Sequence, residues 1–547
     1  MQHDYKIQLF FSPLQTKVSE PRKQFLDELE KLFNSEDDYC NYSLGYNSGF
    51  NVENNNVHID RDKYLPVLLR LSLECPFQDV RESSSRILKK LESQGVRIPR
   101  CKYNGPSKFI SQTDCVPTNT NDEKIKNLFI DAYIVTGRIS HVKQLLAYHT
   151  DYLTCFFQFE THLMNYDGPL PLDWRYFIGI MGASRHQCSL LIEGCEQMFL
   201  INHGDPNWLN GLSNVPQKLK NLNKLNVILA HQPWLINENV MEILLNNQVS
   251  EDNWSKSELA QAIVILVHFQ TLSGFVYGCG VAPEIDMHNG STLRSMSVSE
   301  TSSGTETITP TKLKANSFTY DGGSTAALLQ KIQSVIDEQI SSSQSEEDEQ
   351  LEKLRQFKEV ETKEFDEETY DVVKESSNSF HKRYCDDSTY QEFAKRDKSI
   401  EVFRAHDYSW DEHGFSFINR LYPEFGDLLD KKFSCAHNLT YRTMGDHITN
   451  VDTSKFRLAT WNYIHLLFGI FHDDYVYNEV NTLLEKSYKT YIKKVACFPE
   501  QITFLDYWEC YTDMLASEKI HINLLVMESR MQAVLLYAFR YLTTYMK

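Results

Sequence analysis

The sequence predicts an all-α protein. In two long stretches, 122–286 and 376–547, apolar residues recur three and four positions apart, as they do on the buried face of a helix. The first stretch contains no alternating segments bounded by hairpin turns, so we expect no sheet there. A Ser/Thr-rich and then acidic segment, 287–375, lies between them. We therefore expect two globular helical domains joined by a partly disordered acidic linker.

Residues 1–121 form an N-terminal region that we expect to be partly helical and partly flexible. Tyr64–Leu73 and Val80–Leu91 each predict a helix. Asn51–Asn56 and Cys115–Asp122 are rich in turn-forming residues.

Residues 122–286 form the first predicted domain. Its helices are interrupted at Asp167-Gly168-Pro169, at His203-Gly204-Asp205-Pro206 and at Gln232-Pro233, because Gly and Pro disfavour a helix interior. The helices expected are Lys124–Gly137, His141–His149, Leu153–Met164, Leu172–Ile201, Val215–His231, Glu238–Asn247 and Ser255–Gly274.

The linker, 287–375, has three parts. Residues 287–318 contain too few apolar side chains to build a core, which predicts disorder. Ser324–Ile340 predicts one short amphipathic helix with Leu328 and Ile332 on its apolar face. Ser341–Glu375 is strongly acidic and should be solvated.

The second predicted domain, 376–547, is organised around a helix that Asp452 or Thr453 can cap. Gly469 is placed to end it, and Asp473 and Asp474 fit the acidic first turn of a second helix, where they favour the helix dipole. The predicted buried face of the first helix carries Leu458, Trp461, His465 and Phe468.

Two further helices complete the second domain. Asp473–Ala496 is expected as one long helix that ends before Pro499. The last helix is expected to be capped by Ser517 and to run to the C-terminus.

Charge and composition exclude several classes of function. The chain has 55 Lys and Arg against 74 Asp and Glu, a net charge of −19, which argues against nucleic-acid binding and against binding to an anionic membrane. The longest apolar runs, such as Ala262–Val267, are too short to span a bilayer, and the N-terminus has no signal-peptide pattern. The 12 cysteines lack a CxxC pair or zinc-type spacing, so we predict reduced cytosolic thiols, no metal site and no cofactor.

Two groups of residues could carry chemistry. Cys188 follows Arg185 and His186, and a neighbouring cation lowers a thiol pKa, so Cys188 is a candidate redox nucleophile; the alternative is a buried structural thiol. Glu518 and Arg457 provide the opposite charges that a free amino acid would need in a protected site. The alternative for that pair is an ordinary surface ion pair.

The run TWNYIHLLFGIFHDDYVYNEVN, with HNLTYRT before it and SEKIHINLL after it, resembles the C-terminal half of the sestrins. The similarity extends from about residue 127 to the C-terminus, apart from the linker. It implies that the two domains are related helical units of the small peroxidase type.

The resemblance also implies a leucine-type amino-acid site. A glutamate would hold the amino group, an arginine the carboxylate, and three threonines would form a lid. The matching residues are Glu518, Arg457, Thr440, Thr443, Thr453, Tyr441 and His521. This chain has Phe456, Tyr511 and Met514 where the resemblance leads us to expect a leucine, a tryptophan and a phenylalanine.

The function that the resemblance implies is a stress-response protein that senses amino acids, leucine first among them. It would bind and inhibit the GATOR complex, restrain TOR kinase signalling, and release the complex when the ligand binds. Asp473 and Asp474 would belong to the surface that binds this partner, and the expected location is the cytoplasm and also the nucleus.

The alternative function is a thiol-dependent alkyl hydroperoxide reductase that uses Cys188. In this chain Leu190 and Cys195 replace the tyrosine and the histidine that would assist the thiol. We therefore expect at most a weak activity in a protein that is primarily a non-enzymatic sensor. A third possibility is a helical scaffold with neither function.

Overall fold

The computed structural model is all-α, with three two-residue strand pairs among the residues it describes. It describes residues 4–34, 39–40, 57–58, 61–246, 249–292, 324–338, 346–366, 380–385, 393–439, 444–445 and 451–545. The chain forms two compact units. Unit 1 contains residues 1–107, 111–145 and 282–320, and unit 2 contains residues 108–110, 146–281 and 321–547.

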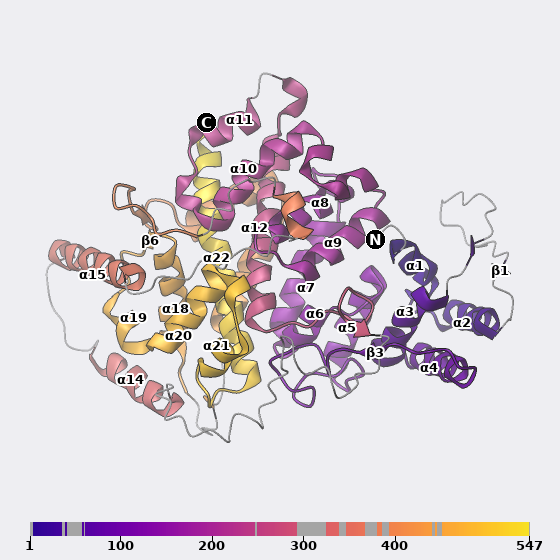
Figure 1. Cartoon of the computed structure of the whole chain (residues 1–547). Coiled ribbons are helices and arrows are strands. Elements are labelled where there is room, and N and C mark those ends of the chain that lie inside the picture. Colours follow the sequence, from indigo (N-terminus) through magenta and orange to yellow (C-terminus); the bar gives the residue numbers. More distant parts are fainter. Residues whose placement is uncertain are drawn as a thin grey trace. The chain divides into compact units, whose positions relative to one another are not determined.

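Unit 1 is built on helices from the N-terminal region (Figure 1). The predicted helices appear as α3, Arg61–Glu74, and α4, Gln78–Ser93, which pack against each other. The sequence analysis missed two further helices, α1, Asp4–Phe10, and α2, Ser19–Asn34. The remaining elements of this part are α5 (Glu123–Thr136), α6 (His141–Leu146), and the antiparallel pairs β1 (Tyr39–Cys40) with β2 (Val57–His58) and β3 (Arg100–Cys101) with β4 (Ser291–Thr292).

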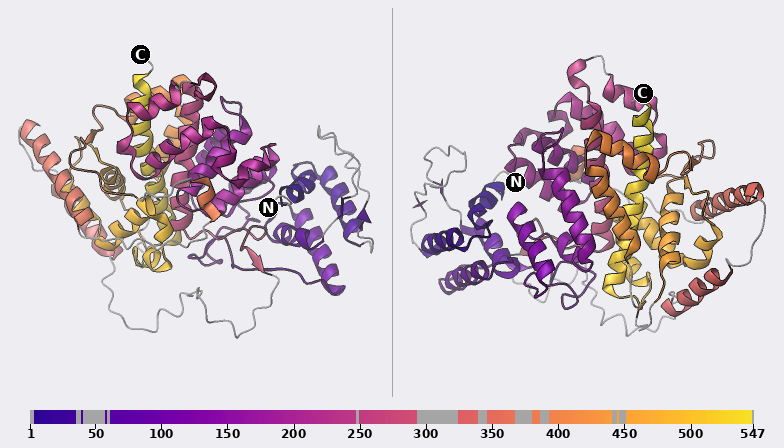
Figure 2. Two further views of the ribbon diagram at one scale, coloured as in Figure 1. Left: turned by 45° about the horizontal axis from the view of Figure 1, so that its top comes forward. Right: turned by 180° about the vertical axis from the view of Figure 1, so that it is seen from behind.

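Unit 2 joins helices from both halves of the sequence. Its centre is α12, Lys256–Gly278, which packs on α8, Leu172–Ser184, and on α22, Ala516–Thr544 (Figure 2). Helix α12 is long and apolar enough to cross a membrane by length and composition alone, but every residue in its most apolar stretch is buried in the unit. It is therefore best explained as a core helix. The predicted boundaries at 286 and 376 do not coincide with this grouping.

The other helices of unit 2 come from residues 150–245 and 325–509. They are α7 (Thr150–Asn165), α9 (Ser189–Ile201), α10 (Gln217–His231), α11 (Glu238–Leu245), α14 (Thr325–Glu338), α15 (Glu346–Asp366), α16 (Phe415–Leu421), α17 (Phe425–Asn438), α18 (Ser454–Leu467), α19 (Asn478–Leu483), α20 (Lys486–Cys497) and α21 (Phe504–Glu509). Strands β5 (Phe403–Arg404) and β6 (Ile470–Phe471) pair in parallel.

Three helix predictions in unit 2 were wrong. The expected helix Leu172–Ile201 is broken between α8 and α9, where Gln187 adopts a φ of +51°. The expected helix Asp473–Ala496 begins only at Asn478, and it is divided into α19 and α20. Ser517, the expected N-cap of the last helix, lies in the first turn of α22, whose N-cap is Leu515. In each case the helix end in the structure lies where the local sequence carries no Gly or Pro.

Two described segments of the linker, Thr325–Glu338 and Glu346–Asp366, are helical. The predicted helix 324–340 is confirmed as α14, with Leu328 and Ile332 buried, and it packs on α19. The acidic segment was expected to be solvated, but 346–366 forms α15 and buries Phe357 and Val360. A buried ion pair between Arg396 and Glu361, at 3.0 Å, helps to hold α15 in place. The predicted disorder of 287–318 falls almost wholly on residues outside the described part of the chain.

Candidate functional site

Arg457 is buried in the first turn of α18 and links two helices. Its Nη1 donates to the carbonyl oxygen of His437 in the last turn of α17, and its Nε donates to Thr453 Oγ1 over 3.1 Å. A cation at the C-terminal end of a helix is favoured by the dipole of that helix. Arg457 is therefore an internal residue that fixes the end of α17, and the alternative of a surface ion pair is wrong.

Glu518 is buried in the first turn of α22. Its carboxylate accepts from the backbone N–H of Leu515 over 2.7 Å and from that of Gly445 over 3.0 Å. The first bond completes a capping arrangement at the helix N-terminus, where negative charge is favoured. The second ties the connection between α17 and α18 to the start of α22.

His521 lies one turn along α22 from Glu518 and faces the end of α17. Burial lowers the pKa of His521 to about 3, and the positive charge of Arg457 adds to that effect. The imidazole is therefore neutral, and its Nε2 carries the hydrogen that is donated to the carbonyl oxygen of Ala436 over 2.8 Å. These contacts bring the start of α22 and the start of α18 to the same end of α17.

Aromatic residues adjoin this charged group. Phe456, beside Arg457, has its ring centroid 5.1 Å from that of Tyr488 and 6.3 Å from that of Tyr511. Tyr511 and Met514 are both buried, and Tyr511 has a φ of +71°, a conformation that non-glycine residues rarely adopt. Of the three residues that differ from those the resemblance predicts, Phe456 and Tyr511 therefore lie in one aromatic cluster.

The predicted lid is described only in part. Thr453 is buried at the N-cap of α18 and holds Arg457 through its hydroxyl, although its side chain makes no capping bond. Thr440, Tyr441 and Thr443 lie outside the described residues. Gly445, with a φ of +63°, is the described part of the same connection that reaches Glu518.

The linker helix α14 adjoins this connection, which the sequence analysis did not predict. The backbone N–H and the hydroxyl of Thr325 donate to Asp513 over 2.9 and 2.6 Å. A side chain at Gly445 would meet the Thr325 hydroxyl and the carbonyl oxygen of Asp513, at 3.0 and 2.9 Å from its Cβ. Only a residue without a side chain fits there, since the backbone conformation is also left-handed.

Cys188 is the N-cap of α9 and is buried. Burial raises the pKa of its thiol to about 11, and the backbone N–H of Leu191 and the hydroxyl of Ser273, which favour the thiolate, do not outweigh it. The expected lowering of the pKa by Arg185 and His186 is therefore wrong. The imidazole of His186 instead accepts from Arg530 over 2.8 Å.

We expect Cys188 to be a poor peroxide nucleophile, because a buried thiol with a raised pKa supplies little thiolate at neutral pH. Turnover of an organic hydroperoxide, coupled to a reducing thiol, should therefore be no faster in the wild type than in Cys188→Ser. The check is stopped-flow and coupled-assay kinetics of the wild type and Cys188→Ser. Fast turnover that disappears in Cys188→Ser would contradict this prediction.

Asp473 and Asp474 lie in a turn between β6 and α19, not in the first turn of a helix as expected. Asp474 is exposed, whereas Asp473 is partly buried and forms a 3.9 Å ion pair with Arg404. Dipole complementation is therefore not their role. An exposed acidic side chain in a turn is available to a basic partner.

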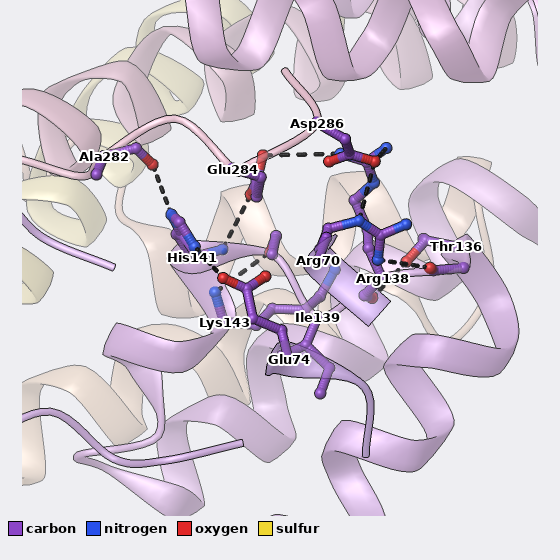
Figure 3. A network of polar contacts seen from close by, with 12 residues as sticks. Arg70, Glu74, Thr136, Arg138, Ile139, His141, Lys143, Ala282, Glu284 and Asp286 are labelled. Carbon is purple, nitrogen blue, oxygen red and sulfur yellow. Dashed lines mark hydrogen bonds and ion pairs between the residues drawn. The ribbon is translucent and has the colours of Figure 1, made fainter. Parts of the chain in front are cut away.

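Unit 1 contains a separate polar network, shown in Figure 3. Arg70 and Arg138 bind Asp286, at 2.9 and 3.3 Å. Burial favours the neutral form of His141 and so lowers its pKa. The carboxylates of Glu74 and Glu284 outweigh this effect and raise the pKa of His141 to about 9. Arg70, Arg138 and His141 thus pair with carboxylates, and the network holds the 136–143 and 282–286 segments to α3.

Comparison with known proteins gives one consistent result. The family model described as "PA26 p53-induced protein (sestrin)" matches residues 105–546. Sestrin-1 of Macaca fascicularis is 41% identical over 480 residues, covering 83% of this chain and 93% of that protein. Sestrin-3 of Mus musculus is 39% identical, covering 84% and 96%, and Sestrin-2 of Homo sapiens is 39% identical, covering 83% and 93%.

Proposed function

The chain belongs to the sestrin family, and on that premise we propose that it is a cytoplasmic and nuclear amino-acid sensor, with leucine as its expected ligand, that binds the GATOR complex and restrains TOR signalling. The observation that carries the proposal is the placement of Glu518 and Arg457. Both are buried. Arg457 binds the His437 carbonyl at the end of α17, and Glu518 lies one turn before His521, which binds the Ala436 carbonyl at the same end. A free amino acid needs one anion and one cation in such a protected place.

The structure suggests how a ligand would change partner binding. The ammonium of an amino acid is a donor that competes with the N–H of Gly445 for the Glu518 carboxylate. Binding would therefore rearrange the connection between α17 and α18, in which the predicted lid residues Thr440 and Thr443 lie. The partner is released only if the ligand binds the free sensor better than the complexed one.

The direct test is isothermal titration of the full-length protein with each standard amino acid. We expect leucine to bind, with its affinity set by Phe456, Tyr511 and Met514 at the apolar end of the site. Absence of binding by any amino acid at millimolar concentration would remove the sensing function and leave the family assignment in place.

Replacing Asp473 and Asp474 together by Ala should abolish capture of the GATOR complex and leave ligand affinity nearly unchanged. Asp474 is exposed and the Asp473–Arg404 pair is partly exposed, so the loss should cost at most about 1 kcal/mol of stability. A pull-down with purified GATOR complex measures the effect. The matched control is Asp411→Ala with Glu412→Ala, an exposed acidic pair of the same unit; equal capture by both double variants would contradict the prediction.

A further inference from the structure

Two thiols meet where α7 packs on α17. The helices lie antiparallel: the ring of His162 lies 5.8 Å from that of Phe425 at the start of α17, whereas Phe159, earlier in α7, contacts Lys432, later in α17. Lys432 Nζ lies 4.2 Å from the centroid of the Phe159 ring. Cys435, one turn after Lys432, and Cys155, one turn before Phe159, therefore lie at the same level of this antiparallel contact.

Both thiols are accessible, unlike most cysteines of the described chain. Cys155 and Cys435 are half-buried, whereas Cys188, Cys195 and Cys279, for example, are buried. Accessibility matters because oxidation requires a small oxidant to reach the sulfur atom.

The surroundings favour one thiolate in the pair. The hydrogen bond from Cys435 lowers the pKa of Cys155 to about 7, and the positive charge of Lys431 also lowers it. Burial and the negative charges of Asp151 and Glu528 act in the opposite direction. The same hydrogen bond raises the pKa of Cys435. The pair therefore titrates as a unit that loses its first proton near neutral pH and keeps the second.

We propose that Cys155 and Cys435 form a peroxide-sensitive thiol pair that closes a disulfide between α7 and α17. The Cys155 thiolate attacks one oxygen of hydrogen peroxide, the O–O bond breaks, and the departing hydroxide takes a proton to leave as water. The sulfenic acid formed on Cys155 is then attacked by the Cys435 sulfur, which loses its proton as the S–S bond forms and a second water leaves. Two thiols are oxidised and one peroxide is reduced.

The disulfide would act on the candidate ligand site through the last turn of α17. The carbonyl of Cys435 accepts from Leu439, and the carbonyls of the next two residues accept from His521 and from Arg457. A disulfide constrains its two Cα atoms to about 4.4–6.8 Å, so its closure should shift these acceptors. This second step rests on the proposed function, and we expect the disulfide to weaken leucine binding about threefold or more.

The first experiment oxidises the full-length protein with hydrogen peroxide near neutral pH. We expect the intact mass to fall by two hydrogens, a crosslinked peptide joining residues 155 and 435, and reversal by a reducing agent. Cys435→Ser should instead accumulate a dimedone-reactive sulfenic acid on Cys155. Cys101→Ser and Cys115→Ser, which change two other half-buried thiols, are the matched controls and should behave like the wild type. Full oxidation without a 155–435 crosslink would overturn the proposal.

The second experiment titrates leucine into reduced and oxidised wild type and into the Cys155→Ser, Cys435→Ser double variant. Weaker binding only in oxidised wild type supports the coupling. Equal binding in both states overturns the coupling while the disulfide stands. A protein that forms the disulfide but binds no amino acid in either state overturns the proposed function and not the thiol pair.

Discussion

Glu518→Gln should weaken amino-acid binding at least tenfold and leave the protein folded. The amide keeps one oxygen to accept from Leu515 or Gly445, so the cost to the start of α22 should be about 1 kcal/mol. The negative charge that would pair with the ligand ammonium is lost, and truncating one partner of a desolvated charge pair costs about 2–5 kcal/mol. A tenfold loss of affinity requires only about 1.4 kcal/mol.

The measurement is isothermal titration of wild type and variant with leucine. Glu258→Gln is the matched control, because Glu258 occupies the same capping position at the start of α12 and lies in the same unit. Arg457→Gln should lose affinity to a similar degree, since the guanidinium would bind the ligand carboxylate. Both site variants should retain the GATOR complex when leucine is supplied. Wild-type affinity in Glu518→Gln would contradict the assignment of the ammonium site.

Periodicity predicted α7, α10, α11 and α12 well, because their buried faces are built from residues three and four apart. It failed where tertiary packing ends a helix without a local signal. Gln187 adopts a left-handed conformation between α8 and α9, although neither Gly nor Pro is present in that break. The same reason explains α15: its acidic sequence predicts a solvated segment, but Phe357 and Val360 supply enough apolar surface to dock it.

The candidate site shows the limit of the same method. The sequence indicated Glu518 and Arg457 as residues of suitable charge. Their burial and their position near the end of α17 depend on how α17, α18 and α22 pack together. The contact of Thr325 with Asp513 was also beyond reach, since it joins residues 188 positions apart. The resemblance singled out Glu518, Arg457 and Thr453, whereas no pattern indicated that Gly445 would bind Glu518.

Removing Lys432 should be the most destabilising single change considered for unit 2. Its Nζ lies 3.0 Å from Glu528 Oε2, neither side chain is exposed, and the Tyr152 hydroxyl donates to the same carboxylate. The network joins α7, α17 and α22, and Nζ also lies 4.2 Å from the centroid of the Phe159 ring. Lys432→Met leaves the Glu528 carboxylate buried without its cation, which typically costs about 3–5 kcal/mol.

Urea unfolding, followed by a signal of unit 2, should therefore show a much lower midpoint for Lys432→Met. The control is the triple variant Tyr152→Phe, Lys432→Met, Glu528→Met, because replacing all three polar partners leaves no buried charge behind. Since apolar replacement of a whole buried ion pair is often neutral or stabilising, most of the lost stability should return. If Lys432→Met and the triple variant unfold at the same urea concentration, the loss comes from packing, and the ion pair does not account for the stability of this contact.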